Sequence, residues 1–179
     1  MKDTDNLSPS FRVGVPEGDD RERSICTRCG FVDYVNPKIV VGSVATDDQG
    51  RILLCRRAIE PRKGWWTLPA GYLETGEGTE EGAQREAREE AGAVLTIDTL
   101  LAVYSIVRIS QVQLIYRARL DNPDTIAPGP ESQELQLVAY EDIPWTELAF
   151  PSVAWALKDW HDVRDETIFA PRQTPQGGL

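Results

Sequence analysis

Three glutamates near the middle of the chain are spaced so that a helix would place them on one face. Glu86, Glu89 and Glu90 stand at i, i+3 and i+4, and at about 100° per residue they fall within an arc of about 100°. Like charges one turn apart destabilise a helix by roughly 0.2–0.5 kcal/mol per pair. Mg²⁺ takes oxygen ligands, typically one or two carboxylates together with substrate phosphates. We therefore predict that this acidic face binds a divalent cation.

The helix that must carry these glutamates has recognisable ends. Thr79 is a suitable N-cap, and Glu80 and Glu81 follow it where the helix dipole favours acidic residues. Gly92 is a suitable C-terminal stop. Glu81 and Arg85 stand at i and i+4, which predicts an ion pair on the solvated face.

The sequence predicts strands in the segments on both sides of this helix, and one further helix near the end of the chain. The turn at 47–50 predicts a hairpin between strands 39–46 and 51–57. A short strand is expected in 65–74, and longer ones at 95–107, 111–120 and 135–140. Pro151 in its first turn favours a closing amphipathic helix over 151–162. We expect an N-terminal segment 1–36, a main domain 37–165 and a flexible tail 166–179.

Composition excludes several classes of protein. The chain has 179 residues and is 41% hydrophobic, enough for one core. A net charge of −10 argues against a general nucleic-acid or anionic-membrane binder. No apolar run is long enough for a transmembrane helix, and the first residues lack the apolar stretch of a secretory signal. Three cysteines do not make a disulfide framework. We expect a cytoplasmic protein.

The spacing around the three glutamates resembles a known signature. Gly71 is followed after five residues by Glu77, and after seven more by the run from Arg85 to Ala93. This pattern resembles the Nudix box, with every signature position filled. The resemblance implies an α/β fold, an α/β/α sandwich around a mixed β-sheet, and hydrolysis of a nucleoside diphosphate linked to another moiety. It covers about residues 40–160.

The resemblance also implies roles for individual residues. The counterparts of Glu86, Glu89 and Glu90 bind Mg²⁺ or Mn²⁺ in the family, and the backbone carbonyl of the residue before the box glycine, here Ala70, often completes the metal shell. The remaining box residues are expected to be structural: Glu77 and Arg85 as a pair that braces the loop against the helix, and Gly71 and Gly92 for their backbone conformation.

The general base stays open between two positions. Some family members use the position of Glu86, and others use a glutamate in a loop well downstream. In this chain that loop offers Glu131 and Glu134. Glu134 lies just before the expected strand at 135–140, and we take it as the candidate base or further ligand. Glu131 is interpreted as a solvated loop residue.

Substrate-binding candidates lie just before the box. Arg56, Arg62 and Lys63 belong to a basic cluster, together with Arg57, that could hold a diphosphate. Trp65 and Trp66 are adjacent, so one faces the core and the other the opposite side. We take Trp66 as the ring that could stack on an adenine or flavin, with core packing as the alternative.

Cys26 and Cys29 resemble one knuckle of a zinc ribbon. A group of bacterial Nudix proteins and their plant relatives carries a full ribbon before the catalytic domain. The first knuckle, expected near Ser8 to Val13, is missing here. A closed zinc site needs four ligands, so we expect a relict ribbon without zinc. An alternative is a zinc ion shared by Cys26 and Cys29 of two subunits.

The ribbon-bearing subgroup points to adenine dinucleotide-type substrates. We expect a Nudix pyrophosphatase that cleaves ADP-ribose, FAD or NAD(H) to AMP and a phosphorylated product. NADH ranks lower, because the NADH-specific branch has a segment after the box that this chain lacks. Two alternatives remain: a nucleoside triphosphate-sanitising enzyme, and a non-catalytic Nudix ligand sensor. By resemblance, the partner is a small nucleotide with no nucleic acid or membrane, and the protein forms a homodimer.

Overall fold

The computed structural model describes residues 10–177. The chain divides into two compact units, one ending at Asn36 and the other beginning at Pro37. The first unit is a three-stranded antiparallel sheet of β1 (Phe11–Gly14), β2 (Arg23–Cys26) and β3 (Val32–Asp33), in the order β1-β2-β3. Its core is small: Ile25 and Cys26 are its buried apolar residues.

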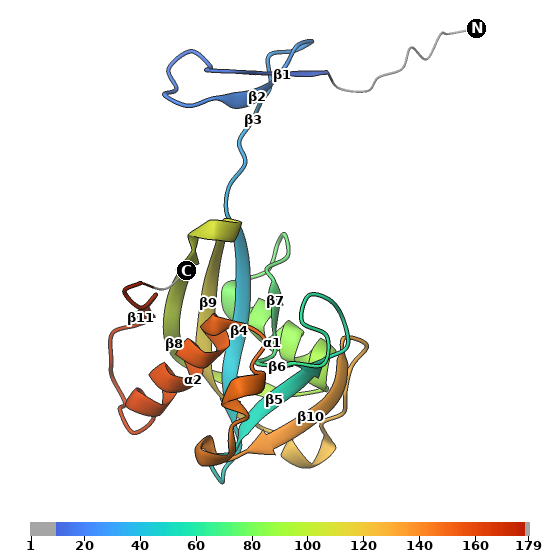
Figure 1. The fold of residues 1–179 in the computed structure, drawn as a ribbon, viewed down its shortest axis with the longest axis vertical. Coiled ribbons are helices and arrows are strands. Elements are labelled where there is room, and N and C mark those ends of the chain that lie inside the picture. Colours follow the sequence, from blue (N-terminus) through green and yellow to red (C-terminus); the bar gives the residue numbers. More distant parts are fainter. Residues whose placement is uncertain (1–9, 178–179) are drawn as a thin grey trace, which may run out of the picture. The chain divides into compact units, whose positions relative to one another are not determined.

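The second unit contains a large mixed sheet and two helices (Figure 1). Its strands run in the order β10-β5-β4-β9-β8-β11, with β6 paired to β5 and β7 paired to β4. The elements are β4 (Lys38–Thr46), β5 (Ile52–Arg57), β6 (Trp66–Thr67), β7 (Ala70–Tyr72), α1 (Thr79–Ala91), β8 (Leu95–Ile106), β9 (Gln111–Leu120), β10 (Ser132–Val138), α2 (Pro151–Val163) and β11 (Arg172–Gln173), with 3₁₀ turns at Val107–Ile109, Pro123–Thr125, Tyr140–Asp142 and Trp145–Glu147.

Alternation along the strands divides the core into two layers, one under each helix. In β4, the side chain of Val44 packs with buried apolar residues of α2. The side chains of Val41 and Ala45 point to the other face of the sheet and pack with buried alanines of α1. In β5, Leu54 belongs to the α2 layer and Leu53 to the α1 layer. This is the two-residue period of a strand that is buried on both faces. The predicted α/β/α sandwich with a mixed sheet is confirmed: β4 and β9 are parallel, and β8 and β9 are antiparallel.

Three local expectations need correction. The N-cap of α1 is Gly78, not Thr79. Glu81 is not paired with Arg85, because its carboxylate accepts the backbone N–H of Gly78 at 2.8 Å and so closes the first turn of the helix. The expected hairpin of β4 and β5 has a single paired position, Thr46 with Ile52; β4 also pairs with β7 at Val40–Gly42, and with β9 along its opposite edge.

The C-terminal segment contains a strand that the flexible-tail expectation missed. Arg172 and Gln173 form β11, which pairs in parallel with Ala102 and Val103 of β8. The backbone N–H of Ser105 also donates to the Thr174 hydroxyl at 2.8 Å. Backbone pairing with the open edge of β8 orders this stretch although it has no apolar pattern of its own. In the part of the chain that the structure describes, no helix is long and apolar enough to cross a membrane.

Candidate active site

Strand β7 and helix α1 meet at the acidic face of the helix. A Cβ atom on Gly71 would collide with the carboxylate of Glu86, so any larger residue here would displace that side chain. One residue earlier, the backbone N–H of Ala70 donates to the Glu90 carboxylate at 3.3 Å. The box glycine therefore lets the strand backbone approach the carboxylates of the helix.

Glu86 and Glu90 are buried carboxylates that repel each other. Glu86 is 9% exposed and Glu90 is 6% exposed. Burial, followed by the charge of Glu86, raises the pKa of Glu90 to about 8. Burial also raises the pKa of Glu86, against the opposing effect of Arg85. Among the described residues Glu90 has no ion-pair partner. Hard oxygen donors with uncompensated charge suit a divalent cation.

Arg85 connects the box loop to the acidic face. Its guanidinium donates to both carboxylate oxygens of Glu77, at 3.0 and 2.8 Å, and to the backbone carbonyl of Tyr72 at 2.9 Å. The same group donates to Glu86 at 2.8 Å and Glu89 at 3.0 Å. The bidentate pair holds the loop against the helix, and this contact lowers the pKa of Glu77 to about 2.

Arg85 also joins Glu89 to Glu86, since one nitrogen of its guanidinium binds both carboxylates and leaves Glu90 outside the ion pairs. The Glu89 side chain is 60% exposed and turned to Arg85. Across residues 10–177, no three His, Cys, Asp or Glu side chains gather closely enough to enclose a metal ion. Mutual repulsion explains why the three carboxylates do not gather around one point. The Arg85 guanidinium supplies positive charge to the carboxylates of Glu86 and Glu89. Glu86 and Glu90 are therefore the best placed candidate ligands, because Glu89 is exposed and turned to Arg85.

The loop before β10 is fixed to the C-terminal end of α1. The backbone N–H groups of Ala127 and Gly129 donate to the last carbonyls of the helix, those of Ala91 at 3.0 Å and Glu90 at 2.9 Å. The carbonyl of Glu131 accepts the N–H of Ala58 at 2.7 Å. These bonds satisfy helix-end carbonyls that otherwise lack partners. They also bring Glu131 close enough for its charge to raise the pKa of both buried glutamates of the site.

Glu134 points elsewhere. A bulge between Ser132 and Glu134 shifts the register of β10, so that Glu134 lies opposite Arg56 of β5. Its carboxylate accepts the Arg56 guanidinium at 3.1 Å. Glu131 is exposed, as its interpretation as a solvated residue expects, but it is the loop glutamate whose charge reaches Glu86 and Glu90, whereas Glu134 is paired with Arg56.

The basic cluster forms a tight loop between β5 and β6. Arg56 donates to the carbonyl of Gly64 at 2.9 Å, and Arg57 donates to that of Pro61 at 2.8 Å. Arg57 also lies near enough to Glu90 to lower its pKa. Arg62 has a positive φ of 66° and its guanidinium sits 4.8 Å from the centre of the Trp65 ring. Lys63 is exposed.

The tryptophan assignment was wrong. Trp66 is 4% exposed and belongs to the main core, so its ring cannot stack on a substrate. It pairs with β5 through the backbone, and this fixes its side chain inward. Trp65 is the partly exposed ring and carries Arg62 on its face. Sequence alone left the choice of inward face open, because both residues are equally apolar.

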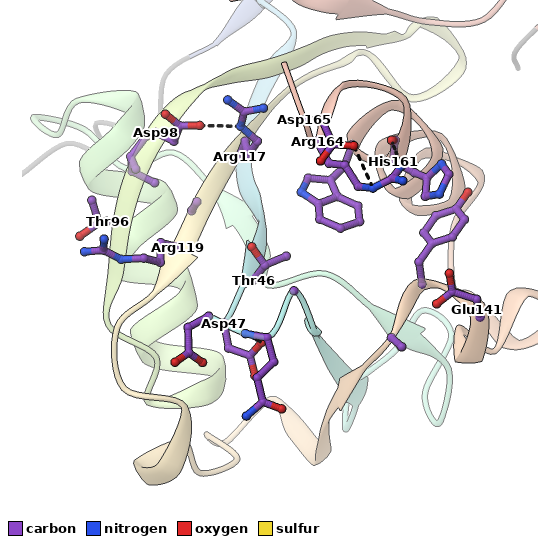
Figure 2. Close-up of a pocket in the computed structure, with 18 residues that line it drawn as sticks. Thr46, Asp47, Thr96, Asp98, Arg117, Arg119, Glu141, His161, Arg164 and Asp165 are labelled. Atoms are coloured by element: carbon purple, nitrogen blue, oxygen red, sulfur yellow. Dashed lines mark hydrogen bonds and ion pairs between the residues drawn. The ribbon is translucent and has the colours of Figure 1, made fainter. Parts of the chain in front are cut away.

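An open cavity of about 840 Å³ lies away from these residues, between the C-terminal part of α2, the ends of β8 and β9, and the turn after β4 (Figure 2). Glu86, Glu89 and Glu90 do not line it. Its basic side chains are already engaged: Arg117 with Asp98, and Arg164 with the carbonyl of His161. The cavity therefore offers no unpaired cation for a phosphate.

Comparison with known families agrees with this geometry. Residues 36–160 match the family model described as NUDIX domain, and residues 9–35 match a zinc-ribbon model described as Nudix N-terminal. The chain belongs to the Nudix family. The N-terminal match falls within the first unit of the structure, and the other match covers the large sheet except β11, and both helices except for the last residues of α2.

Individual relatives extend the comparison. A NUDIX hydrolase from Nitrosomonas europaea of known crystal structure is 39% identical, with a TM-score of 0.86 over 97% of this chain and 98% of its own. An ADP-ribose pyrophosphatase of Methanocaldococcus jannaschii is 40% identical over 72 residues, which are 40% of this chain and 42% of that protein. A human 8-oxo-dGDP phosphatase is 44% identical over 64 residues, 36% of this chain and 20% of that protein. The chain thus spans less than half the length of these two curated relatives.

Proposed function

We propose that this Nudix protein is a divalent-metal-dependent pyrophosphatase that acts on a nucleoside diphosphate linked to another moiety. The observation that carries the proposal is the pair of buried carboxylates, Glu86 and Glu90. Each is buried at a position where its charge is costly, and the β7 backbone comes close to both, at Gly71 to Glu86 and at Ala70 to Glu90. Such a site is stable as a charged pair only with a cation, and a diphosphate is a natural further ligand of that cation.

Different residues of the chain would bind the metal, accept the proton and bind the phosphate. Glu86, Glu89 and Glu90, with the backbone at Ala70, would hold Mg²⁺ or Mn²⁺. When bound, the ion would neutralise the diphosphate and lower the pKa of a bound water. Glu131 would be the group that accepts a proton from the attacking water, because its loop is bonded to the end of α1 beside Glu90. Arg57 places positive charge near the same carboxylates, where a substrate phosphate would lie.

We propose an adenine dinucleotide-type substrate: ADP-ribose, FAD or NAD(H), cleaved to AMP and a phosphorylated product. Trp65 supports this choice, since its partly exposed ring offers a surface on which a base can stack once Arg62 moves aside. The similarity to an ADP-ribose pyrophosphatase supports it as well.

The second candidate is a phosphatase that removes damaged nucleotides from the pool. It is favoured by the 44% identity to a human 8-oxo-dGDP phosphatase over 64 residues. A ligand sensor is disfavoured, because Glu86, Glu89 and Glu90 are all present.

The decisive experiment is a substrate panel with product analysis. ADP-ribose, FAD, NADH, diadenosine polyphosphates, dGTP and 8-oxo-dGDP are incubated with the protein in Mg²⁺ or Mn²⁺, and the products are separated. We expect AMP from one of the dinucleotides, no reaction in EDTA, and recovery when metal is restored. Full activity in EDTA would overturn the metal site, and preference for 8-oxo-dGDP would favour the second candidate. Gel filtration with light scattering in the same buffers tests the expected homodimer.

A further inference from the structure

The N-terminal unit matches a zinc-ribbon family but does not have the ligands of a zinc site. A structural zinc ion takes four ligands in a tetrahedron, usually from two knuckles. Residues 10–36 contain Cys26 and Cys29, with no further cysteine and no histidine. Cys55 is buried in the core of the other unit, among residues under α1. Within residues 10–36 no Asp or Glu side chain joins the two cysteines as a third donor, so the donor set is half of what zinc requires and zinc does not fit it.

Cys26 and Cys29 lie at the end of the unit where β2 turns into β3. This end is closed by hydrogen bonds. The backbone N–H of Cys26 donates to the carbonyl of Phe31 at 2.7 Å, and the N–H of Gly30 donates back to the carbonyl of Cys26 at 3.0 Å. Gly30 has φ 75°, the left-handed conformation that lets so short a turn close. Thr27 donates its N–H, at 2.8 Å, and its hydroxyl, at 3.1 Å, to the carbonyl of Ser10.

The opposite end, between β1 and β2, is held by one acidic side chain. The N–H of Asp19 closes a turn on the carbonyl of Pro16 at 3.1 Å, with Gly18 at φ 82°. The Asp19 carboxylate then accepts the N–H groups of Asp20 at 2.7 Å and Arg21 at 3.2 Å.

The same carboxylate joins this turn to the strands. Asp19 accepts Nε of Arg23 at 3.0 Å, and these side chains are only 13% and 25% exposed. The Arg23 guanidinium lies 5.2 Å from the centre of the Tyr34 ring, which follows β3. A chain of contacts from Asp19 through Arg23 to Tyr34 thus spans all three strands of the sheet, from the β1–β2 turn to the residue after β3.

We propose that the N-terminal unit is a metal-free ribbon, in which the Asp19–Arg23–Tyr34 contacts and the Thr27–Ser10 bonds hold the strands that zinc holds in the family. The unit has little apolar core of its own, so these polar contacts decide whether its sheet stays closed. We expect its amides to exchange with solvent faster than those of the Nudix domain, because partly exposed polar contacts resist opening less than a packed core does.

The test combines metal analysis with hydrogen exchange on the full chain. Protein purified without added metal is assayed for zinc, and exchange is followed by mass spectrometry in peptides from residues 10–36, with and without EDTA. We expect far less than one zinc per chain and no effect of EDTA on exchange. One zinc per chain would overturn the proposal. Half a zinc per chain, with dissociation of a dimer in EDTA, would overturn it in favour of a zinc shared between two copies.

Variants distinguish the contribution of the polar contacts to the stability of the unit from the contribution of the two thiols. Asp19→Asn should speed exchange in residues 10–36 by about two- to fivefold, and Arg23→Met should do the same. Asp20→Asn is the matched control, because the Asp20 side chain is 90% exposed. The double variant Cys26→Ser, Cys29→Ser should leave exchange close to that of the parent. The proposal fails if the double serine variant loosens the unit and the Asp19 and Arg23 variants do not.

Discussion

The backbone N–H of Gly129 donates to the carbonyl of Glu90 at 2.9 Å. The bond joins the loop that carries Glu131 to the last turn of the helix that carries the acidic face. A Cβ atom on Gly129 would overlap the carbonyl of Glu89, so the loop can come this close only with glycine here. The candidate metal ligands and the candidate base are thus held together by one hydrogen-bonded junction between α1 and the loop before β10.

The first prediction separates the two loop glutamates. Glu131→Gln should lower kcat by about 10²- to 10⁴-fold, the usual contribution of a general base, with KM little changed. Glu134→Gln should keep kcat within about tenfold of the parent, because its carboxylate is paired with Arg56 at 3.1 Å. Steady-state kinetics on the best substrate of the panel gives both numbers. If Glu134→Gln is the more damaging change, the base assignment is wrong.

The second prediction concerns the buried end of the acidic face. Glu90→Gln should lower kcat by about 100-fold or more, because a lost ligand removes several kcal/mol of charge stabilisation. Glu80→Gln is the control on the same helix, where the side chain is exposed. Both variants should fold, as circular dichroism can show. Calorimetric titration with Mn²⁺ should find weaker binding for Glu90→Gln only, and equal binding in both variants would move the metal site elsewhere.

The third prediction is a pH-dependent contribution of Glu77 to stability. Arg85 lowers the pKa of Glu77 from 4.5 to about 2, so the charged form is favoured in the folded state. The contribution is complete above pH 4.5 and disappears as the pH falls through about 2. Glu77→Gln should therefore be less stable than the parent at pH 7; the difference should begin to shrink below pH 4.5 and close only as the pH falls through about 2. Urea unfolding at several pH values measures the difference, and a gap that is constant with pH would contradict the pairing.

The fourth prediction contrasts the two tryptophans. Trp66→Ala should cost about 3–5 kcal/mol of unfolding free energy, as expected for a large core ring. Trp65→Ala should leave stability nearly unchanged and raise KM for an adenine substrate by about three- to tenfold, since an aromatic stack is worth about 0.5–1.5 kcal/mol. Chemical unfolding and kinetics on the same two variants provide the check. A Trp65→Ala variant with unaltered KM would remove this ring from the substrate site.

The sequence predicted the helix that carries the acidic face because its signals are local. The spacing of Glu86, Glu89 and Glu90 and the stop at Gly92 depend on neighbours within one or two turns. Strands and the mixed sheet followed from apolar runs and from resemblance to the Nudix fold. The parallel pairing of β4 with β9 could not be read from the hairpin signal at 47–50, because it joins segments far apart in the chain.

The candidate site was less predictable where it depends on register. One bulge in β10 decides that Glu134 faces Arg56, and a shift of one residue exchanges the two faces of a strand. Trp65 and Trp66 presented the same problem, since adjacent aromatic residues give no sign of which one points inward. The role of Glu81 was missed because a glutamate in the first turn can bond either to a partner along the helix or back to the backbone before it, and here it bonds to Gly78.

The two-residue strand β11 has a consequence for handling the protein. It lies alongside β8, an outer strand of the large sheet, and occupies its backbone groups at Ala102 and Val103. An uncovered strand edge is a template on which another chain can add, and this is a common start of aggregation. Removing the residues from Arg172 onward would expose the edge of β8 in every molecule. A loss of solubility after such a truncation would then come from this exposed edge and not from unfolding of the rest of the domain.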